Sequence, residues 1–478
     1  MGGLGAALSA PLLGAVRRGQ FDAAAAVLEQ AATDGVIRAA CLGVIHAKDE
    51  FHRAFGAAKS PEAMFLLASV SKTFSIAAVM TLVDQGKLRL DDPVVKYLPE
   101  FSAGPRCQIT LAQLMTHTSG LPDQLSENAA LRKRHASLAE FVEGAVQTPL
   151  LFEPGEKYSY SSMGILLASE VGRRIAGGDF REFVERAVYK PLDLQHSAMG
   201  LGRFRLEDLI LNQTEKAAPE SGGGDPAAKD WDWNSRYWRT LGAPWGTAHG
   251  SAPDVARFYF EFLHPTERMM KPETARLMIR NHNPEGMTPR GLGFAVGTRS
   301  GAPGCSAKTF GHGGSTGTLV WADPGTDTVC AVLTTLPGGA VTPHPRDVAS
   351  GLVAKAGSRT TAMKDPARLV AALFRIRDCI DEKVSRRELA YLDELIRSGE
   401  STDWLANLSL FAAVKGDKYL WGGMGTLPDN VRLKARMNQA FEDSYLELAL
   451  VCRDLDLESI YSKDVLDLDR SMRAKRTQ

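Results

Sequence analysis

An apolar stretch, FLLASVSKTFSIAAVMTLVDQGKLRL in residues 65–90, constrains the fold of this chain more than any other segment. Its apolar residues recur at helical spacing as far as Val83, small residues stand near its start, and Gly86 follows just past the end of this apolar run. The pattern predicts a buried helix of about four turns. A buried helix needs other elements around it, so we expect the middle of the chain to form a scaffold for this one.

Ser69 and Lys72 share one face at the start of this helix, because residues three apart are neighbours on a helix. A hydroxyl is a poor nucleophile until a base takes its proton, and a lysine at a buried helix N-terminus can act as that base. The pair therefore predicts an active site. The alternative is a structural helix start, since a Ser-x-x-Lys pattern also arises by chance on solvated helices. Here it occurs once, in a helix too apolar to be solvated.

The composition of the 478 residues excludes several classes of function. The 56 basic residues balance the 56 acidic ones, so nothing points to a nucleic acid or an anionic membrane as a partner. The cysteines show no Cys-x-x-Cys or Cys/His cluster, which favours free thiols over a disulfide framework or a zinc site. The six cysteines are Cys41, Cys107, Cys305, Cys330, Cys379 and Cys452.

The first 20 residues do not resemble a secretory signal, because their arginines follow the apolar part instead of preceding it. No apolar segment reaches about 18 residues, the length that spans a membrane. We therefore predict a soluble, cytoplasmic protein with no membrane partner.

Segments that favour a sheet occur at both ends of the first 357 residues. Apolar alternation predicts strands at 37–46, 50–56, 291–298 and 318–335, the last with a turn at Asp323-Pro324-Gly325. Helical spacing predicts helices at 12–34, 109–115, 178–189 and 254–263, and a second apolar helix within 151–175.

Beyond about residue 358 the chain is richer in charge and nearly free of glycine apart from WGGMG at 421–425. Amphipathic spacing there predicts helices at 366–381, 384–397, 403–414 and 430–454. We therefore predict two domains, residues 1–357 and a C-terminal helical domain of unknown function at residues 359–478.

Four of the seven tryptophans lie close together after a flexible SGGGDPAAK segment. Aromatic side chains that follow a flexible loop can line a binding cleft, and Trp238 is our candidate substrate contact among them. A local hydrophobic plug would give the same pattern, and both interpretations stay open. The four are Trp231, Trp233, Trp238 and Trp245.

Two further residues suit proton transfer near a serine nucleophile. Tyr160 stands in a polar Tyr-Ser-Ser run at a helix start, where its hydroxyl could pass a proton between Ser69, Lys72 and a leaving group. His312 lies in the glycine-rich segment 310–317, where an imidazole can donate hydrogen bonds or shuttle a proton. Taken alone, each residue also fits a structural role in the core.

In their order along the chain, five motifs resemble the serine beta-lactamase and D-alanyl-D-alanine peptidase family, and most of all its class C and family VIII esterase branch. The motifs are Ser69-Val70-Ser71-Lys72, LMTHTSGLPD at 114–123, PGEKYSYSSMG at 154–164, PLDL at 191–194 and FGHGGSTGTLVWADP at 310–324. The resemblance covers about residues 20–355. It implies an α/β fold of the α+β kind, in which helices flank an antiparallel sheet beside an all-helical cluster.

The resemblance also implies roles for individual residues. Ser69 corresponds to the nucleophile, Lys72 to its general base and Tyr160 to the proton relay, while His312, Gly313 and Gly314 form the third motif. The backbone amides of Ser69 and Ser315 would form the oxyanion hole, which suits an amide at a helix start.

Two positions depart from the family pattern. The Tyr-x-Asn triplet reads Tyr160-Ser161-Ser162, so a shorter hydroxyl at Ser162 replaces the amide that holds a substrate carbonyl. The third motif has His312 where a lysine is usual, which weakens recognition of a carboxylate there. Both departures favour small esters or amides over penicillins as substrates.

The predicted function is therefore a serine hydrolase that forms an acyl-enzyme on Ser69, of the carboxylesterase type, with no metal or organic cofactor. A beta-lactamase or a D-aminopeptidase or D-alanyl-D-alanine carboxypeptidase is the first alternative. A non-catalytic binding or scaffold protein that keeps the fold is the second. The expected partner is a small ester, amide or lactam, and the oligomeric state stays open.

Overall fold

The computed structural model describes residues 21–362, and the side chains of residues 21–357. Residues Phe21–Ala354 form one compact unit. The first 20 residues lie outside the described residues, and with them the first part of the helix predicted at 12–34. All four helices predicted in the C-terminal domain also lie outside the described residues. The division of the chain into two domains therefore stays a prediction.

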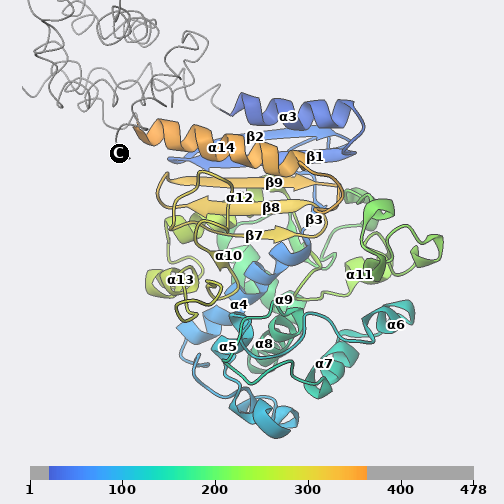
Figure 1. Ribbon diagram of the computed structural model, residues 1–478, viewed down its shortest axis with the longest axis vertical. Coiled ribbons are helices and arrows are strands. Elements are labelled where there is room, and N and C mark those ends of the chain that lie inside the picture. The colour runs from blue at the N-terminus through green and yellow to red at the C-terminus, as the bar shows by residue number, and fades with distance from the viewer. Residues whose placement is uncertain (1–20, 363–478) are drawn as a thin grey trace, which may run out of the picture. The chain divides into compact units, whose positions relative to one another are not determined.

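A six-stranded antiparallel sheet in the order β2-β1-β9-β8-β7-β6 joins the two ends of this unit (Figure 1). β1 from the start of the unit pairs with β9 from its end, with Ala40 opposite Thr334. Every residue of both strands is buried. The strands are β1 Ala39–His46, β2 Asp49–Gly56, β6 Ala295–Val296, β7 Phe310–Gly314, β8 Thr318–Asp323 and β9 Thr328–Thr334.

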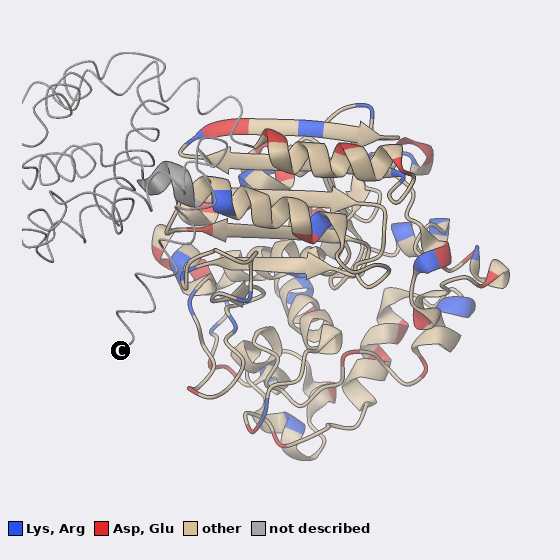
Figure 2. Cartoon of the chain, turned by 45° about the horizontal axis from the view of Figure 1, so that its top comes forward, with Lys and Arg blue, Asp and Glu red and all other residues tan. Residues whose placement is uncertain are grey.

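Helices cover both faces of the sheet. The helices α3 (Asp22–Thr33) and α14 (Pro345–Ala362) lie over one face, where Trp321 Nε1 of β8 donates a hydrogen bond to Ser350 Oγ of α14 at 2.7 Å (Figure 1). The helix α12 (Ala252–Leu263) packs against β1, β8 and β9. The charged residues of the sheet gather on β2, which forms one edge (Figure 2). Charge on an edge strand discourages pairing with other chains.

The helical cluster packs around the helix predicted from the apolar stretch. This helix, α4, runs Ser71–Asp84, and its residues 71–82 are all buried, as the sequence predicted. It packs against α8, which in turn contacts α5 and α7. The other helices are α5 Leu111–Met115, α6 Asn128–Lys133, α7 Leu138–Gln147, α8 Ser162–Ala176, α9 Phe180–Val184, α10 Lys190–Leu192, α11 Arg236–Thr240 and α13 Pro272–Met278.

Two predicted elements differ from the structure. The strand predicted at 291–298 shrinks to β6, because Gly293 and Gly297 take positive φ angles of 79° and 92° that break an extended strand. The helix predicted at 178–189 is α9 followed by a wider turn, Glu185–Tyr189. The hairpin predicted within 318–335 is confirmed, since β8 and β9 pair with Asp323 opposite Thr328.

A small second sheet, in the order β3-β5-β4, leads into α4. Its strands are β3 Phe65–Leu66, β4 Ser197–Met199 and β5 Ala248–Gly250. Between β3 and α4 the chain makes a 3₁₀ turn, Ala68–Val70. The fold thereby holds this turn between the helical cluster and β7, which contacts it.

Gly314 of β7 should not tolerate a side chain, because a Cβ atom there would lie 2.5 Å from the carbonyl oxygen of Leu67. We expect Gly314→Ala to lower the free energy of unfolding by about 1–3 kcal/mol, the usual cost of overpacking. Urea denaturation would measure it. The neighbouring Gly313→Ala is the matched control, since its Cβ would meet no atom closer than 3.9 Å. Equal losses in both variants would contradict this account of the packing.

Candidate active site

Ser69 and Lys72 meet at the junction of the 3₁₀ turn and α4. Lys72 Nζ donates to Ser69 Oγ at 2.9 Å and to the carbonyl oxygen of Trp245 at 3.0 Å. The lysine side chain is fully buried. Ala68, just before the serine, has a φ of 47°, a left-handed conformation that is strained for a residue with a side chain. The turn therefore presents the hydroxyl within reach of proton transfer to Lys72.

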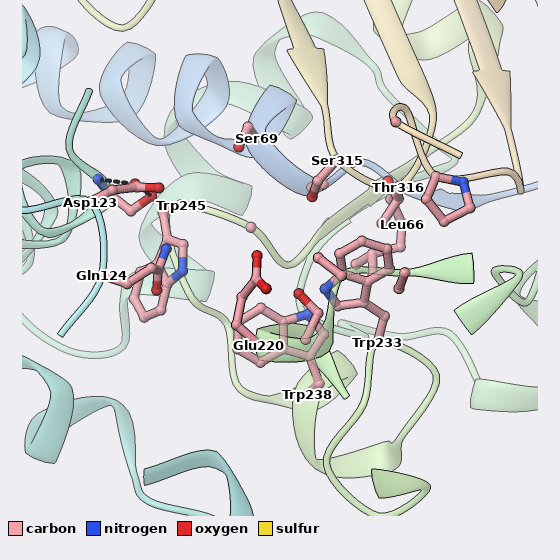
Figure 3. Close-up of a pocket in the computed structure, with 18 of the residues that line it drawn as sticks. Leu66, Ser69, Asp123, Gln124, Glu220, Trp233, Trp238, Trp245, Ser315 and Thr316 are labelled. Atoms are coloured by element: carbon pink, nitrogen blue, oxygen red, sulfur yellow. Dashed lines mark hydrogen bonds between the residues drawn. The ribbon is translucent and has the colours of Figure 1, made fainter. Parts of the chain in front are cut away.

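The strand β7 and the segment after it lie against the turn of Ser69. Thr316 Oγ1 donates to the carbonyl of Leu66 at 2.8 Å, and Thr318 Oγ1 donates to that of Leu67 at 2.9 Å. Ser69 and Ser315 line one pocket and lie near one another across it (Figure 3). The structure thus brings together the two residues whose amides were predicted to form the oxyanion hole.

Tyr160 lies beside the lysine in the same pocket. Lys72 Nζ is 4.8 Å from the centroid of the Tyr160 ring. Within residues 21–357, no hydrogen bond holds the Tyr160 hydroxyl. The hydroxyl is therefore free to bond a substrate or a leaving group.

Behind Tyr160, two buried histidines face a buried arginine that the sequence analysis did not single out. Arg290 Nη2 lies 2.9 Å from His117 Nε2 and 3.4 Å from His312 Nε2. His312 Nδ1 donates to the carbonyl of Gly313 at 2.8 Å, which leaves its Nε2 to accept from Arg290. Burial lowers the pKa of both histidines well below its usual value, and the charges of Arg290 and Lys72 lower it further. Both ring nitrogens of His312 are thus engaged by protein groups.

Ser162 also has a partner that the sequence analysis missed. Its backbone N–H and its hydroxyl both donate to Asp123 Oδ1, at 2.9 and 2.6 Å (Figure 3). The Asp123 carboxylate thus contacts the N-terminus of α8 from a loop earlier in the sequence. A carboxylate there accepts hydrogen bonds from amides that have no partner within the helix, and its negative charge interacts favourably with the helix dipole. The Ser162 hydroxyl therefore donates its hydrogen bond to Asp123 and is not free to donate it to a substrate. Both side chains line the pocket. The signal for Asp123 was present in the LMTHTSGLPD motif, which ends on it.

The pocket over Ser69 has a volume of about 490 Å³. Trp233, Trp238 and Trp245 line it, so three of the four clustered tryptophans form a cleft wall, and Trp231 is buried outside the lining (Figure 3). Glu220 projects into the pocket from a loop between these walls (Figure 3). Among the described residues, no group of three or more His, Cys, Asp or Glu side chains could hold a metal ion. In the same part of the chain, no helix is long and apolar enough to cross a membrane.

Comparisons with known proteins agree with this geometry. Residues 24–355 match the family model described as Beta-lactamase. Protein flp of Staphylococcus aureus strain MW2 is 26% identical over 185 residues, and the match spans 38% of this chain but only 37% of that protein. Penicillin-binding protein 4 of Amycolatopsis lactamdurans is 28% identical over 333 residues, which are 65% of this chain and 80% of that protein.

A solved structure shares the fold. EstCE1, a hydrolase with promiscuous acyltransferase activity, superimposes with a TM-score of 0.59 at 22% identity, covering 70% of this chain and 99% of that chain. The predicted architecture, an antiparallel sheet flanked by helices, is confirmed by this likeness and by the family match.

The buried histidines should make the protein less stable in mild acid. Burial lowers the pKa of His249 to about 3 in the folded protein, whereas a histidine in the unfolded chain has a pKa near 6.5. Between these two pH values the unfolded chain therefore binds a proton at His249 that the folded protein does not bind. The free energy of unfolding should therefore fall with falling pH between about 6.5 and 3, by about 1.4 kcal/mol per pH unit for each such histidine.

His249→Asn would test this, because an asparagine amide can still donate to the carbonyl of Gly200 as His249 Nδ1 does at 2.8 Å. Urea denaturation at pH 7, 6, 5 and 4 should show a slope against pH that is smaller by about 1.4 kcal/mol per pH unit in the variant. Parallel curves for the two proteins would show that His249 does not carry the effect.

Proposed function

This chain belongs to the beta-lactamase family, and from that premise we propose that it is a serine hydrolase that forms an acyl-enzyme on Ser69. The family takes in esterases, penicillin-binding proteins and amidases. One observation carries the proposal: the 2.9 Å hydrogen bond between Lys72 Nζ and Ser69 Oγ, in a pocket that can hold a small molecule. A scaffold protein would not need a fully buried lysine in contact with a serine hydroxyl at the pocket wall.

The proposed reaction has two halves. Lys72 takes the proton of Ser69 Oγ as that oxygen attacks the substrate carbonyl, and the amides of Ser69 and Ser315 stabilise the negative charge that develops on the carbonyl oxygen. Lys72 returns this proton through the Tyr160 hydroxyl to the leaving alcohol or amine as its bond to carbon breaks. A water molecule then attacks the acyl carbon and gives a proton to the same two groups. They pass it to Ser69 Oγ as the ester bond breaks, which releases the acid.

We assign His312 a positioning role in this scheme. Its ring bonds Gly313 on one side and faces Arg290 on the other, so it fixes the backbone that leads to the Ser315 amide. The absence of a lysine in the third motif favours small esters or amides over penicillins as substrates. The carboxylate of Asp123 near Ser162 supports the same choice, because it repels an anionic group bound at that point.

Acylation of Ser69 is the direct test of this function. We expect the wild-type protein to be labelled once by a fluorophosphonate and to release a burst of p-nitrophenol from p-nitrophenyl acetate, with little turnover of nitrocefin. Ser69→Ala should abolish both the label and the burst, as seen by intact mass. Ser126→Ala, at an exposed serine bonded to Glu127, is the control and should keep both. If the fluorophosphonate does not label the wild-type protein, the hydrolase proposal is wrong.

Removing the Tyr160 hydroxyl should slow the reaction and leave the fold intact. Tyr160→Phe keeps the ring that lies against Lys72, and we expect kcat for p-nitrophenyl acetate to fall by about 100-fold or more, the usual share of a proton relay. Tyr158→Phe removes a hydroxyl two residues away and is the matched control. Steady-state kinetics with both variants would decide, and similar kcat values for the two would remove Tyr160 from the mechanism.

A further inference from the structure

The short helix α6 presents two polar side chains to the pocket of Ser69. Asn128 and Arg132 stand four residues apart, so they share one face of the helix, and both line the pocket. Their exposed fractions are only 7% and 3%. Neither belongs to a motif that the sequence analysis used.

Arg132 is a buried cation without a matching anion. Its Nη2 donates to the carbonyl of Trp231 at 3.1 Å, while Nε has no partner among the described residues. Within those residues, no carboxylate oxygen lies within 4 Å of its guanidinium. Burial lowers its pKa to about 10, so it keeps its charge at neutral pH. A buried charge without a counter-ion is costly, and a site that retains one usually has a use for it.

The nearest acidic residues do not neutralise this arginine. Asp232 Oδ1 already accepts hydrogen bonds from the backbone amides of Asn234 and Ser235. Glu220 lines the same pocket but is exposed, and it forms no ion pair with Arg132. The guanidinium instead stacks on the ring of Trp238, with Cζ 4.0 Å from its centroid. Stacking orients the guanidinium plane and leaves N–H donors unused.

Asn128 adds a second unused group. Among the described residues no hydrogen bond involves its carboxamide, although the residue is more than nine-tenths buried. A guanidinium beside a carboxamide is a donor set that matches the oxygens of a carboxylate.

We propose that Arg132 and Asn128 form a subsite, inside the Ser69 pocket, for a carboxylate carried by the substrate. This inference rests on the proposed hydrolase function and narrows its substrates to esters or amides with a carboxylate separated from the scissile bond by an apolar spacer. The tryptophan walls would enclose that spacer. The subsite lies on α6, away from the third motif on β7, so it does not restore penicillin recognition there.

Binding to the inactive Ser69→Ala protein, full chain, tests the subsite independently of catalysis. The probe is monomethyl glutarate, and dimethyl glutarate is its neutral counterpart, both titrated by calorimetry. We expect the monoanion alone to bind. Adding Arg132→Met, which keeps an apolar side chain against Trp238, should weaken it tenfold or more, the loss of a charged hydrogen-bonded pair. Adding Lys133→Met removes an exposed charge from the next residue and should change it less than twofold.

Glu220→Gln gives a second measurement on an exposed residue, where folding is not at risk. Removing its charge should strengthen binding of monomethyl glutarate several-fold, because the two carboxylates would share the pocket. Unchanged or weaker binding in this variant would show that the bound carboxylate does not lie in the pocket that Glu220 and Arg132 both line, and would overturn the proposal.

Turnover shows which end of the substrate carries the carboxylate. With wild-type protein, kcat/KM should favour the p-nitrophenyl half-ester of glutarate over p-nitrophenyl valerate, or 4-acetoxybenzoate over phenyl acetate, and Arg132→Met should abolish that preference. If neither pair shows a preference that depends on Arg132, the subsite is disproved while the hydrolase function stands. If the Ser69→Ala protein binds the monoanion through Arg132 but the wild type acylates on no ester, the hydrolase function fails and the subsite remains.

Discussion

The site depends on two threonine hydroxyls that join segments about 250 residues apart in the sequence. Thr316 and Thr318 donate to the carbonyls of Leu66 and Leu67, which immediately precede the turn of Ser69. Leu66 belongs to β3, and the carbonyl of Leu67 also accepts a hydrogen bond from the N–H of Val70. The two threonines therefore add side-chain donors that tie the turn of Ser69 to the segment between β7 and β8. With the turn held in this place, Ser69 and Ser315 line the same pocket. The whole sheet, with its first and last strands paired, serves to bring the two segments together.

The electrostatics around the nucleophile follow from burial. Lys72 and Arg290 are both buried, and the polar groups between them are the ring of Tyr160 and two histidines whose pKa burial has lowered. No carboxylate of the described residues forms an ion pair with Lys72 or with Arg290. Such a region favours any negative charge that forms there, and the reaction proposed for Ser69 creates one on the carbonyl oxygen.

The sequence predicted the elements whose signal is local. The apolar run predicted α4 because a helix buried on every side is apolar along most of its length, and the Asp-Pro-Gly turn predicted the β8–β9 hairpin. It overstated the strand at 291–298, where the left-handed glycines reverse the chain. It placed Ser69 and Lys72 together because they are three residues apart. Arg132 and Arg290 escaped it, since a lone polar residue in a loop or short helix gives no hint of the distant segment it will face. Asp123 ends a motif that the sequence did show, but its contact with Ser162 could not be read from that motif.

Arg132 shows why such residues carry specificity more than stability. Its helix α6 is too short to be stable alone, and it is held by the packing of Trp231 and Trp238 around the guanidinium. A methionine could fill that space without the desolvation cost of a charge. The charge of Arg132 therefore adds little to the stability of the fold beyond what an apolar side chain would add. Its effect is on the binding of ligands in the pocket that Arg132 lines. The guanidinium of Arg132 already lost its hydration when the protein folded. An anionic ligand that binds there therefore gains the attraction of this cation without the cost of desolvating it.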